Sequence, residues 1–169
     1  NICVNDPTNH FPPLLVALGA SMTIRSAVGE RVVTAEEFFV GVFETAVGEG
    51  DLLTRISVPA AGKGTGDGMA GVTLGAHGTY VANAAASVVD GTWRISLGCV
   101  DAVPHRAAAV ESALVGADVD EAAVRSAVEG LGATLDPPAD VHASAEYRRS
   151  LAETSTVRAV LQAAEKARG

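Results

Sequence analysis

The spacing of apolar residues changes at Pro104, and this change limits the folds open to the chain. Just before this proline, apolar side chains alternate with polar ones, which is the period of a strand with one buried face. After it they recur every third or fourth residue, which is the period of an amphipathic helix. The sequence therefore predicts an α+β protein in which an antiparallel sheet is followed by helices.

Three strands are predicted ahead of Pro104, over residues 72–74, 80–89 and 92–100. The last is the clearest, because Trp93, Ile95 and Leu97 alternate with more polar residues, and Cys99 continues the same apolar face. Asp90-Gly91 is typical of a tight hairpin turn between the last two strands. These signals together predict a three-stranded antiparallel sheet.

Three helices are predicted after Pro104, over residues 106–114, 118–131 and 144–166. Asp118 and Glu121 have the spacing of a capping box, and Ser144 is a suitable cap for the last helix. The apolar face expected for that helix consists of Tyr147, Leu151, Val157, Leu161 and Ala164. The sequence thus predicts three helices that follow the sheet.

The first 13 residues are rich in Asn, Asp and Pro and lead directly into the apolar residues 14–18. This pattern predicts a polar loop that enters a helix, a geometry suited to an anionic cofactor. Because the sequence starts inside such a loop, we expect a piece of a longer protein. Short strands are predicted at 22–25, 31–33 and 51–59, and Thr34 with Glu37 forms a second capping-box pattern.

Residues 60–71 are predicted to form a glycine-rich loop. Gly66 to Gly71 satisfy the GxGxxG pattern, but the residues that follow indicate a strand where a dinucleotide site needs a helix. Lys63 is followed by Gly, whereas a Walker loop needs Ser or Thr at that position. The sequence therefore favours a mobile surface loop over a phosphate site.

Composition narrows the function classes. The net charge of −8 argues against nucleic-acid binding, because an acidic surface repels phosphate. Cys3 and Cys99 lack CxxC spacing, so neither a disulfide framework nor a zinc site is indicated, and a cytoplasmic location is expected. The four histidines have no metal-ligand spacing, and no run of roughly 20 apolar residues predicts a membrane span.

Four blocks of sequence occur in an order typical of one family. They are residues 1–13 (NICVNDPTNHFPP), 38–46 (FFVGVFETA) with 51–59 (DLLTRISVP), 97–99 (LGC) with Pro104 and Arg106, and 144–149 (SAEYRR) with 158–159 (RA). Together they resemble the FAD-binding medium subunit of molybdenum hydroxylases, the family of carbon monoxide dehydrogenase and xanthine dehydrogenase. The resemblance covers nearly the whole chain.

The resemblance implies two domains and one cofactor. Residues 1–65 would be the remnant of the second FAD-binding subdomain, a mixed sheet with short helices. Residues 66–169 would be the C-terminal domain, a three-stranded antiparallel sheet with a three-helix bundle. By position, Asn1, Asp6 and His10 match the loop that lines the FAD, and Leu53 matches a residue near the isoalloxazine. Relatives usually carry an acid where His10 stands, and residues 72–80 replace a block that holds Lys, Arg and Asp in many of them. No catalytic or metal-binding residue is implied.

The resemblance also implies a function. The chain would belong to an FAD-dependent oxidoreductase subunit that takes electrons from [2Fe–2S] clusters on a small subunit and passes them to an external acceptor. A large subunit would carry the molybdopterin centre, in a dimer of heterotrimers. The 169-residue fragment itself is expected to be inactive and unable to hold FAD. Two alternatives stay open: a non-enzymatic subunit-docking module with a vestigial flavin site, and an independent domain that binds a small molecule.

Overall fold

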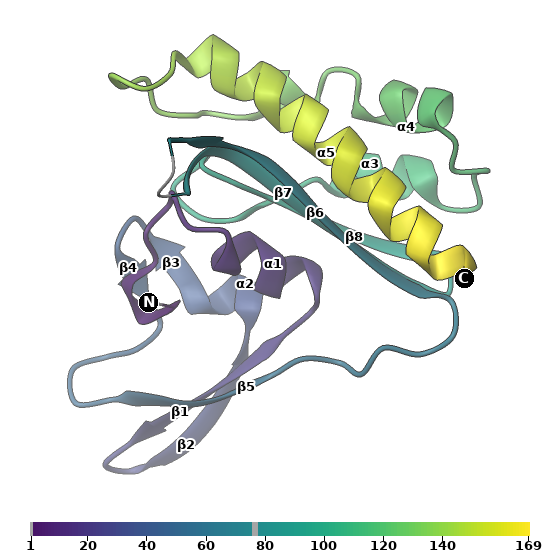
Figure 1. Ribbon diagram of the computed structural model, residues 1–169. Helices are drawn as coiled ribbons and strands as arrows, with labels where there is room; N and C mark the ends of the chain where they lie inside the picture. Colours follow the sequence, from purple (N-terminus) through teal and green to yellow (C-terminus); the bar gives the residue numbers. More distant parts are fainter. Residues whose placement is uncertain (1, 76–77) are drawn as a thin grey trace.

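A computed structural model describes residues 2–75 and 78–169 and contains two packed parts (Figure 1). We name residues 2–57 the N-terminal module and residues 65–169 the C-terminal module, and residues 58–64 link them. The proposed domain boundary between residues 65 and 66 falls at the start of the strand that opens the C-terminal module. Helices and antiparallel strands occur in both modules, so the α+β class is confirmed.

The N-terminal module consists of short elements around a small sheet. In chain order they are η1 (Ile2–Val4), α1 (Phe11–Ala17), β1 (Ser21–Ser26), β2 (Gly29–Thr34), α2 (Ala35–Phe38), β3 (Phe39–Gly41), β4 (Glu44–Thr45) and β5 (Leu52–Ser57). One sheet has the order β2-β1-β5, and β3 pairs with β4. All of these pairs are antiparallel, so the mixed sheet expected for residues 1–65 is corrected. The two-residue connection between β1 and β2 permits only the antiparallel arrangement.

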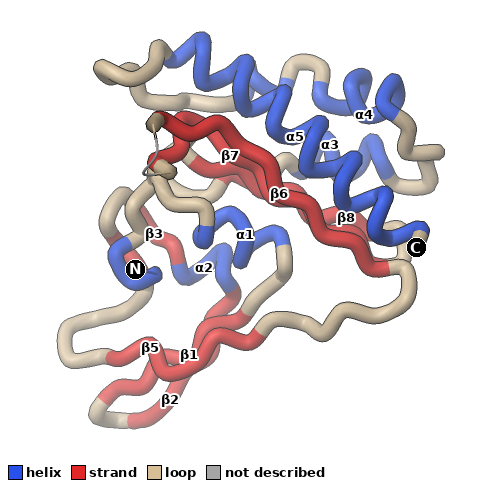
Figure 2. The backbone as a smooth tube through the Cα atoms, in the orientation of Figure 1, coloured by secondary structure: helices blue, strands red, loops and turns tan. Residues whose placement is uncertain are grey.

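The C-terminal module has a longer sheet and three α-helices. Its elements are β6 (Thr65–Leu74), β7 (Thr79–Val89), β8 (Thr92–Gly98), β9 (His105–Arg106), α3 (Ala108–Leu114), α4 (Glu121–Val128), η2 (Leu131–Thr134) and α5 (Ala145–Arg168). The sheet order is β6-β7-β8-β9, so the three predicted strands are joined by one two-residue strand. Figure 2 shows α3, α4 and α5 on one side of this sheet and α1 and α2 on the other. The sheet is therefore the layer that both sets of helices share.

The structure contains the predicted hairpin turn and helix caps, but two helices begin at later residues than predicted. Asp90 and Gly91 have φ of 47° and 79°, as a hairpin turn of type I′ requires. The Ser144 hydroxyl accepts a hydrogen bond from the Tyr147 N–H at 3.1 Å, as a cap does. Asp120, rather than the predicted Asp118, caps α4. Helix α3 begins only at Ala108, because the two residues ahead of Ala107 form β9 and pair with β8.

Residues 65–71 of the glycine-rich segment belong to β6, so the prediction of a mobile loop is wrong there, whereas residues 60–64 lie in the link between the modules. Gly66 and Gly68 lie in β6 where α5 crosses it. A Cβ atom on Gly66 would lie 1.9 Å from the Ala163 carbonyl oxygen, and one on Gly68 would lie 2.0 Å from the Ala159 carbonyl oxygen. The glycines therefore serve close packing between a strand and a helix. Sequence pattern alone cannot distinguish this role from a loop.

The apolar core is divided into two clusters. The larger lies between the sheet of the C-terminal module and its helices, and the smaller lies between α1, α2 and the β2-β1-β5 sheet. The α5 residues in the larger cluster are mostly small: Ala152, Val157, Ala159, Val160, Ala163 and Ala164. Tyr147, predicted on this face, is about half exposed. The buried face of α5 is thus rotated from the predicted one toward the alanines that fit against β6.

Candidate functional site

The opening segment, residues 2–10, is fastened to the β3–β4 turn by Asn5. The buried Asn5 side chain donates through Nδ2 to the carbonyl oxygens of Gly41 at 2.6 Å and Glu44 at 3.2 Å. The Phe43 N–H donates in return to the Asn5 carbonyl oxygen at 3.2 Å. Asn5 has φ of 46°, a left-handed conformation that Asn tolerates better than most residues. The sequence reasoning missed Asn5, because an Asn in a polar loop gives no hint of partners some 36 residues away.

Asp6 is held in one orientation by its neighbour two residues on. Its Oδ1 accepts hydrogen bonds from the Thr8 N–H at 2.9 Å and from the Thr8 hydroxyl at 2.8 Å. This local turn is the kind that Asp residues form in loops. It leaves Asp6 as a fixed negative charge that is only partly buried.

His10 stands at the junction of the two modules. It occupies the position before α1, where its side chain makes no capping hydrogen bond. Its ring stacks on Phe11, with ring centroids 4.5 Å apart, and tilts against Tyr80 of β7 at 5.6 Å. His10 and Phe11 therefore present a small aromatic surface at the start of α1, against Tyr80 of β7.

The other two predicted site residues are placed differently. Asn1 lies outside the described residues. Leu53 lies on β5, opposite Ile24 of β1, and packs against the smaller apolar cluster. Asp6 and His10 therefore lie on the same segment of chain, whereas Leu53 belongs to the sheet of the same module.

A cleft of about 470 Å³ lies beside the opening segment. Five stretches of chain line it: Pro7 and Thr8, Val42 of the β3–β4 turn, Cys99 with Asp101 and Ala102 after β8, residues 136–138 with Asp140 ahead of α5, and Arg148 of α5 itself. Its charged lining consists of Asp101, Asp136, Asp140 and Arg148. Sequence spacing could not reveal this constellation, because its members come from both modules.

Arg148, the one guanidinium in this lining, already has hydrogen-bond partners within the protein. Arg148 is buried and donates through Nη1 to the Val81 carbonyl oxygen at 2.5 Å and through Nη2 to Asp140 Oδ2 at 2.6 Å. Hydrogen bonds from the backbone N–H groups of His142 and Ala143 lower the pKa of Asp140, and Arg148 adds to this effect. The cleft is therefore acidic, since the other two carboxylates have no lining cation left to balance them.

Cys99 lies at the edge of the cleft and is not a nucleophile. Burial raises the pKa of its thiol to about 12, so the thiol stays protonated at neutral pH. Its Sγ accepts a weak hydrogen bond from Asn83 Nδ2 at 3.4 Å. The prediction that Cys99 is a buried residue is confirmed.

These groups would supply one wall of the flavin site that the family resemblance implies. The chain offers an oriented carboxylate, the aromatic surface at His10 and the backbone of the opening segment. FAD also carries two phosphate charges, and residues 1–24 contain no Lys or Arg to balance them. The donor set therefore suits the ring and ribose parts of the cofactor rather than its pyrophosphate.

Within 2–75 and 78–169, no three or more His, Cys, Asp or Glu side chains gather as a metal ion would require. Across the same ranges, no helix combines the length and apolar character needed to cross a bilayer.

Comparison with known proteins covers both modules. Residues 70–163 match the model of the CO dehydrogenase flavoprotein C-terminal domain, and residues 1–61 match that of the FAD-binding domain in molybdopterin dehydrogenase. The carbon monoxide dehydrogenase medium chain of Afipia carboxidovorans is 32% identical over 99% of this chain and 60% of its own length.

Solved structures indicate the same family relationship. Quinoline 2-oxidoreductase from Pseudomonas putida 86 superposes with a TM-score of 0.88 at 31% identity, over 98% of this chain and 59% of its own. Carbon monoxide dehydrogenase from Hydrogenophaga pseudoflava gives 0.89 at 30% identity, over 96% and 58%. The chain thus spans less than two thirds of the length of these relatives. It belongs to the CO dehydrogenase flavoprotein family, with an FAD-binding segment of the molybdopterin dehydrogenase type ahead of the family's C-terminal domain.

Proposed function

We propose that this chain is part of the medium, FAD-binding subunit of a molybdenum hydroxylase, and that its task is electron transfer. The observation that carries the proposal is the match of both modules, in the correct order, to FAD-binding and flavoprotein C-terminal models. In this function FAD, when bound, would accept electrons from [2Fe–2S] clusters and release them to an external acceptor. The protein groups bind and orient the cofactor.

The wall of the flavin site would be the opening segment. Asp6, oriented by Thr8, would accept hydrogen bonds from polar groups of the cofactor, and His10 would pack against it. Asn1 would lie on the same wall, and Leu53 would approach the isoalloxazine. Asn5 would have an indirect part, because it fastens this wall to the β3–β4 turn.

The partners would be an iron–sulfur small subunit and a molybdopterin large subunit, assembled as a dimer of heterotrimers in the cytoplasm. The relatives named medium chain or medium subunit support this arrangement, since such names imply further chains. Residues 1–24 contain no Lys or Arg to balance the cofactor's pyrophosphate, so the 169-residue chain alone would bind FAD weakly and be inactive.

Titration of the 169-residue chain with FAD, followed by flavin fluorescence, tests the affinity. We expect no saturation in the low micromolar range, and submicromolar binding would contradict the proposal. In the complete subunit, His10→Ala should weaken FAD binding by about tenfold, or about 1.4 kcal/mol. His142→Ala is the matched control, because that exposed histidine lies ahead of α5, outside the opening segment, and should leave binding unchanged.

The acidic cleft favours one alternative, a subunit-docking module whose flavin site is vestigial. The absorption spectrum of the purified complete subunit separates the two functions. A yellow protein with one flavin per subunit supports electron transfer. A colourless protein that still binds its partner subunits supports docking alone.

A further inference from the structure

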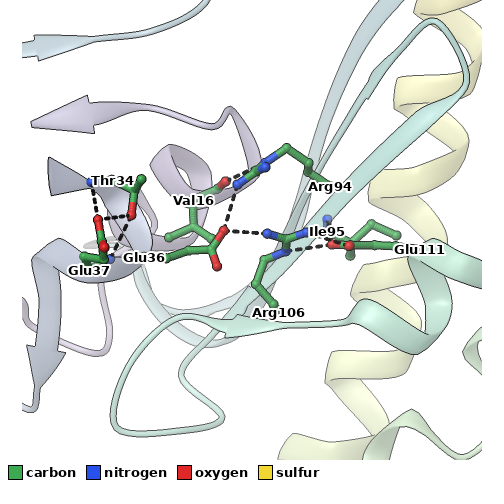
Figure 3. Close-up of polar contacts among 8 residues, drawn as sticks. All are labelled: Val16, Thr34, Glu36, Glu37, Arg94, Ile95, Arg106 and Glu111. Atoms are coloured by element: carbon green, nitrogen blue, oxygen red, sulfur yellow. Dashed lines mark hydrogen bonds and ion pairs between the residues drawn. The ribbon is translucent and has the colours of Figure 1, made fainter.

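Glu36 of α2 lies between two arginines of the other module (Figure 3). Its Oε1 accepts hydrogen bonds from Arg94 Nη2 at 2.7 Å and from Arg106 Nη1 at 2.5 Å. Arg94 belongs to β8 and Arg106 to β9, which are paired strands of the C-terminal sheet. One carboxylate oxygen of the N-terminal module therefore joins two cations of the C-terminal module.

Both arginines are fixed at a second point. Arg94 Nε donates to the Val16 carbonyl oxygen at 3.4 Å, near the end of α1. Arg106 donates through Nε and Nη2 to the two oxygens of Glu111 at 2.8 and 2.6 Å, a bidentate pair. Glu111 also accepts the Ile95 N–H at 2.6 Å, so it ties this guanidinium to the sheet itself. Glu36 thus binds two guanidinium groups that other hydrogen bonds already hold in position (Figure 3).

Other described contacts between the modules are the His10–Tyr80 ring contact and the packing of α1 on β7 and β8. Arg94, Ser96 and Gly98 share the face of β8 that lies under α1. A Cβ on Gly98 would lie 3.0 Å from Pro13 Cγ, so α1 rests almost directly on the strand. The buried Ser96 hydroxyl has no hydrogen-bond partner among the residues that the structure describes. Small side chains let α1 sit close, but they do not fix its angle.

We propose that Glu36 is the centre of an inter-module clamp that fixes the angle between the N-terminal and C-terminal modules. The clamp also sets the width of the cleft, because Thr8 and Val42 line it from one module and Cys99 and Asp101 from the other. Glu36 and Arg94 have side chains 43% and 40% exposed, so each ion pair adds little to the stability of the fold. The expected effect of losing the carboxylate is a change in orientation rather than unfolding. This inference does not depend on the cofactor.

Distance measurement between two spin labels tests the clamp. Val28 in the β1–β2 turn and Val141 ahead of α5 are 98% and 95% exposed, one in each module, and each would be replaced by Cys and labelled. Cys3→Ser removes the exposed native thiol, and Cys99 is buried. Pulsed electron paramagnetic resonance then gives the distribution of distances between the modules. The comparison is between this parent protein, Glu36→Gln and a control.

The control is Glu121→Gln, which breaks an ion pair of similar length, 2.7 Å to Arg125, within a single helix. We expect Glu36→Gln to widen the distance distribution and shift its mean, and Glu121→Gln to leave both unchanged. The distance distribution of the parent protein should widen in the same way at about 1 M NaCl, where the Debye length falls to about 3 Å. The salt measurement tests the clamp even if the Glu36→Gln variant does not fold. The proposal would be overturned if the parent at low salt, the parent at high salt and Glu36→Gln all gave the same distance distribution.

Discussion

Replacing Gly68 by alanine tests the contact between β6 and α5. The new Cβ would lie 2.0 Å from the Ala159 carbonyl oxygen and 2.9 Å from the Ala163 nitrogen, both backbone atoms of the helix. A rotamer change cannot relieve this overlap, since neither obstructing atom belongs to a side chain. Either the strand or the helix must move.

The structure gives the size of the effect. Ordinary contacts to a Cβ begin at 3.4 Å, so α5 must retreat by about 1.4 Å (3.4 − 2.0) at this point. A gap of about 1 Å forfeits up to half of the dispersion attraction across it, and overpacking of this kind costs up to about 3 kcal/mol. Removing a glycine from the unfolded chain offsets about 0.4–1 kcal/mol. We therefore expect a net loss of about 2 kcal/mol in the free energy of unfolding, or about 4–8 °C in Tm for a chain of this size.

Urea unfolding followed by far-UV circular dichroism measures this loss, with Gly62→Ala as the control. Gly62 lies in the link between the modules, and an added Cβ there meets nothing within 4 Å. Its replacement should leave the urea midpoint unchanged or slightly raised. If Gly68→Ala were as stable as Gly62→Ala, the close packing of β6 on α5 would be refuted.

Three further outcomes follow from contacts of the N-terminal module and from Cys99. Asn5→Ala should lower the free energy of unfolding by about 1 kcal/mol more than Asn5→Gly, because only glycine keeps the left-handed backbone without strain; equal urea midpoints would contradict this. A thiol reagent at about pH 8 should modify Cys3 alone in the native chain, since the raised pKa and burial protect Cys99, and two thiols only in denaturant. Hydrogen bonds from Thr34 lower the pKa of Glu37, so the capping box stabilises the protein above the usual carboxyl range and this contribution is lost as pH falls through the lowered pKa. Urea midpoints at neutral and acid pH should therefore differ less for Glu37→Gln than for the unsubstituted chain.

Features with short-range causes could be predicted from the sequence. Asp90-Gly91 predicts its hairpin because both residues accept positive φ, and the turn needs no distant partner. Thr34 with Glu37 and Ser144 likewise cap the helices that directly follow them. The strand–helix order and the family resemblance also rest on continuous stretches of sequence. These elements were therefore found in the right places.

Features with long-range causes could not be predicted. Gly66 and Gly68 resemble a loop until α5, more than 90 residues later, is laid against them. Glu36 meets Arg94 across 58 residues, and no spacing rule connects such a pair. The acidic cleft is assembled from five separate stretches, so its balance of charged side chains could not be read from the sequence. Asp6 and His10 were proposed by resemblance, and their contacts with Thr8 and Tyr80 are new information from the structure.

The contact between β6 and α5 has a consequence for biosynthesis. Lys166 donates to the Asp67 carbonyl oxygen across 99 residues, so the first strand of the C-terminal module is completed by its final helix. While the ribosome makes the intervening residues, β6 lacks the helix that covers its glycines. Pairing at such separation is slow, and the uncovered strand is exposed to aggregation in the meantime. All residues of the small apolar cluster belong to the N-terminal module. This core can therefore form while the rest of the chain is still being translated.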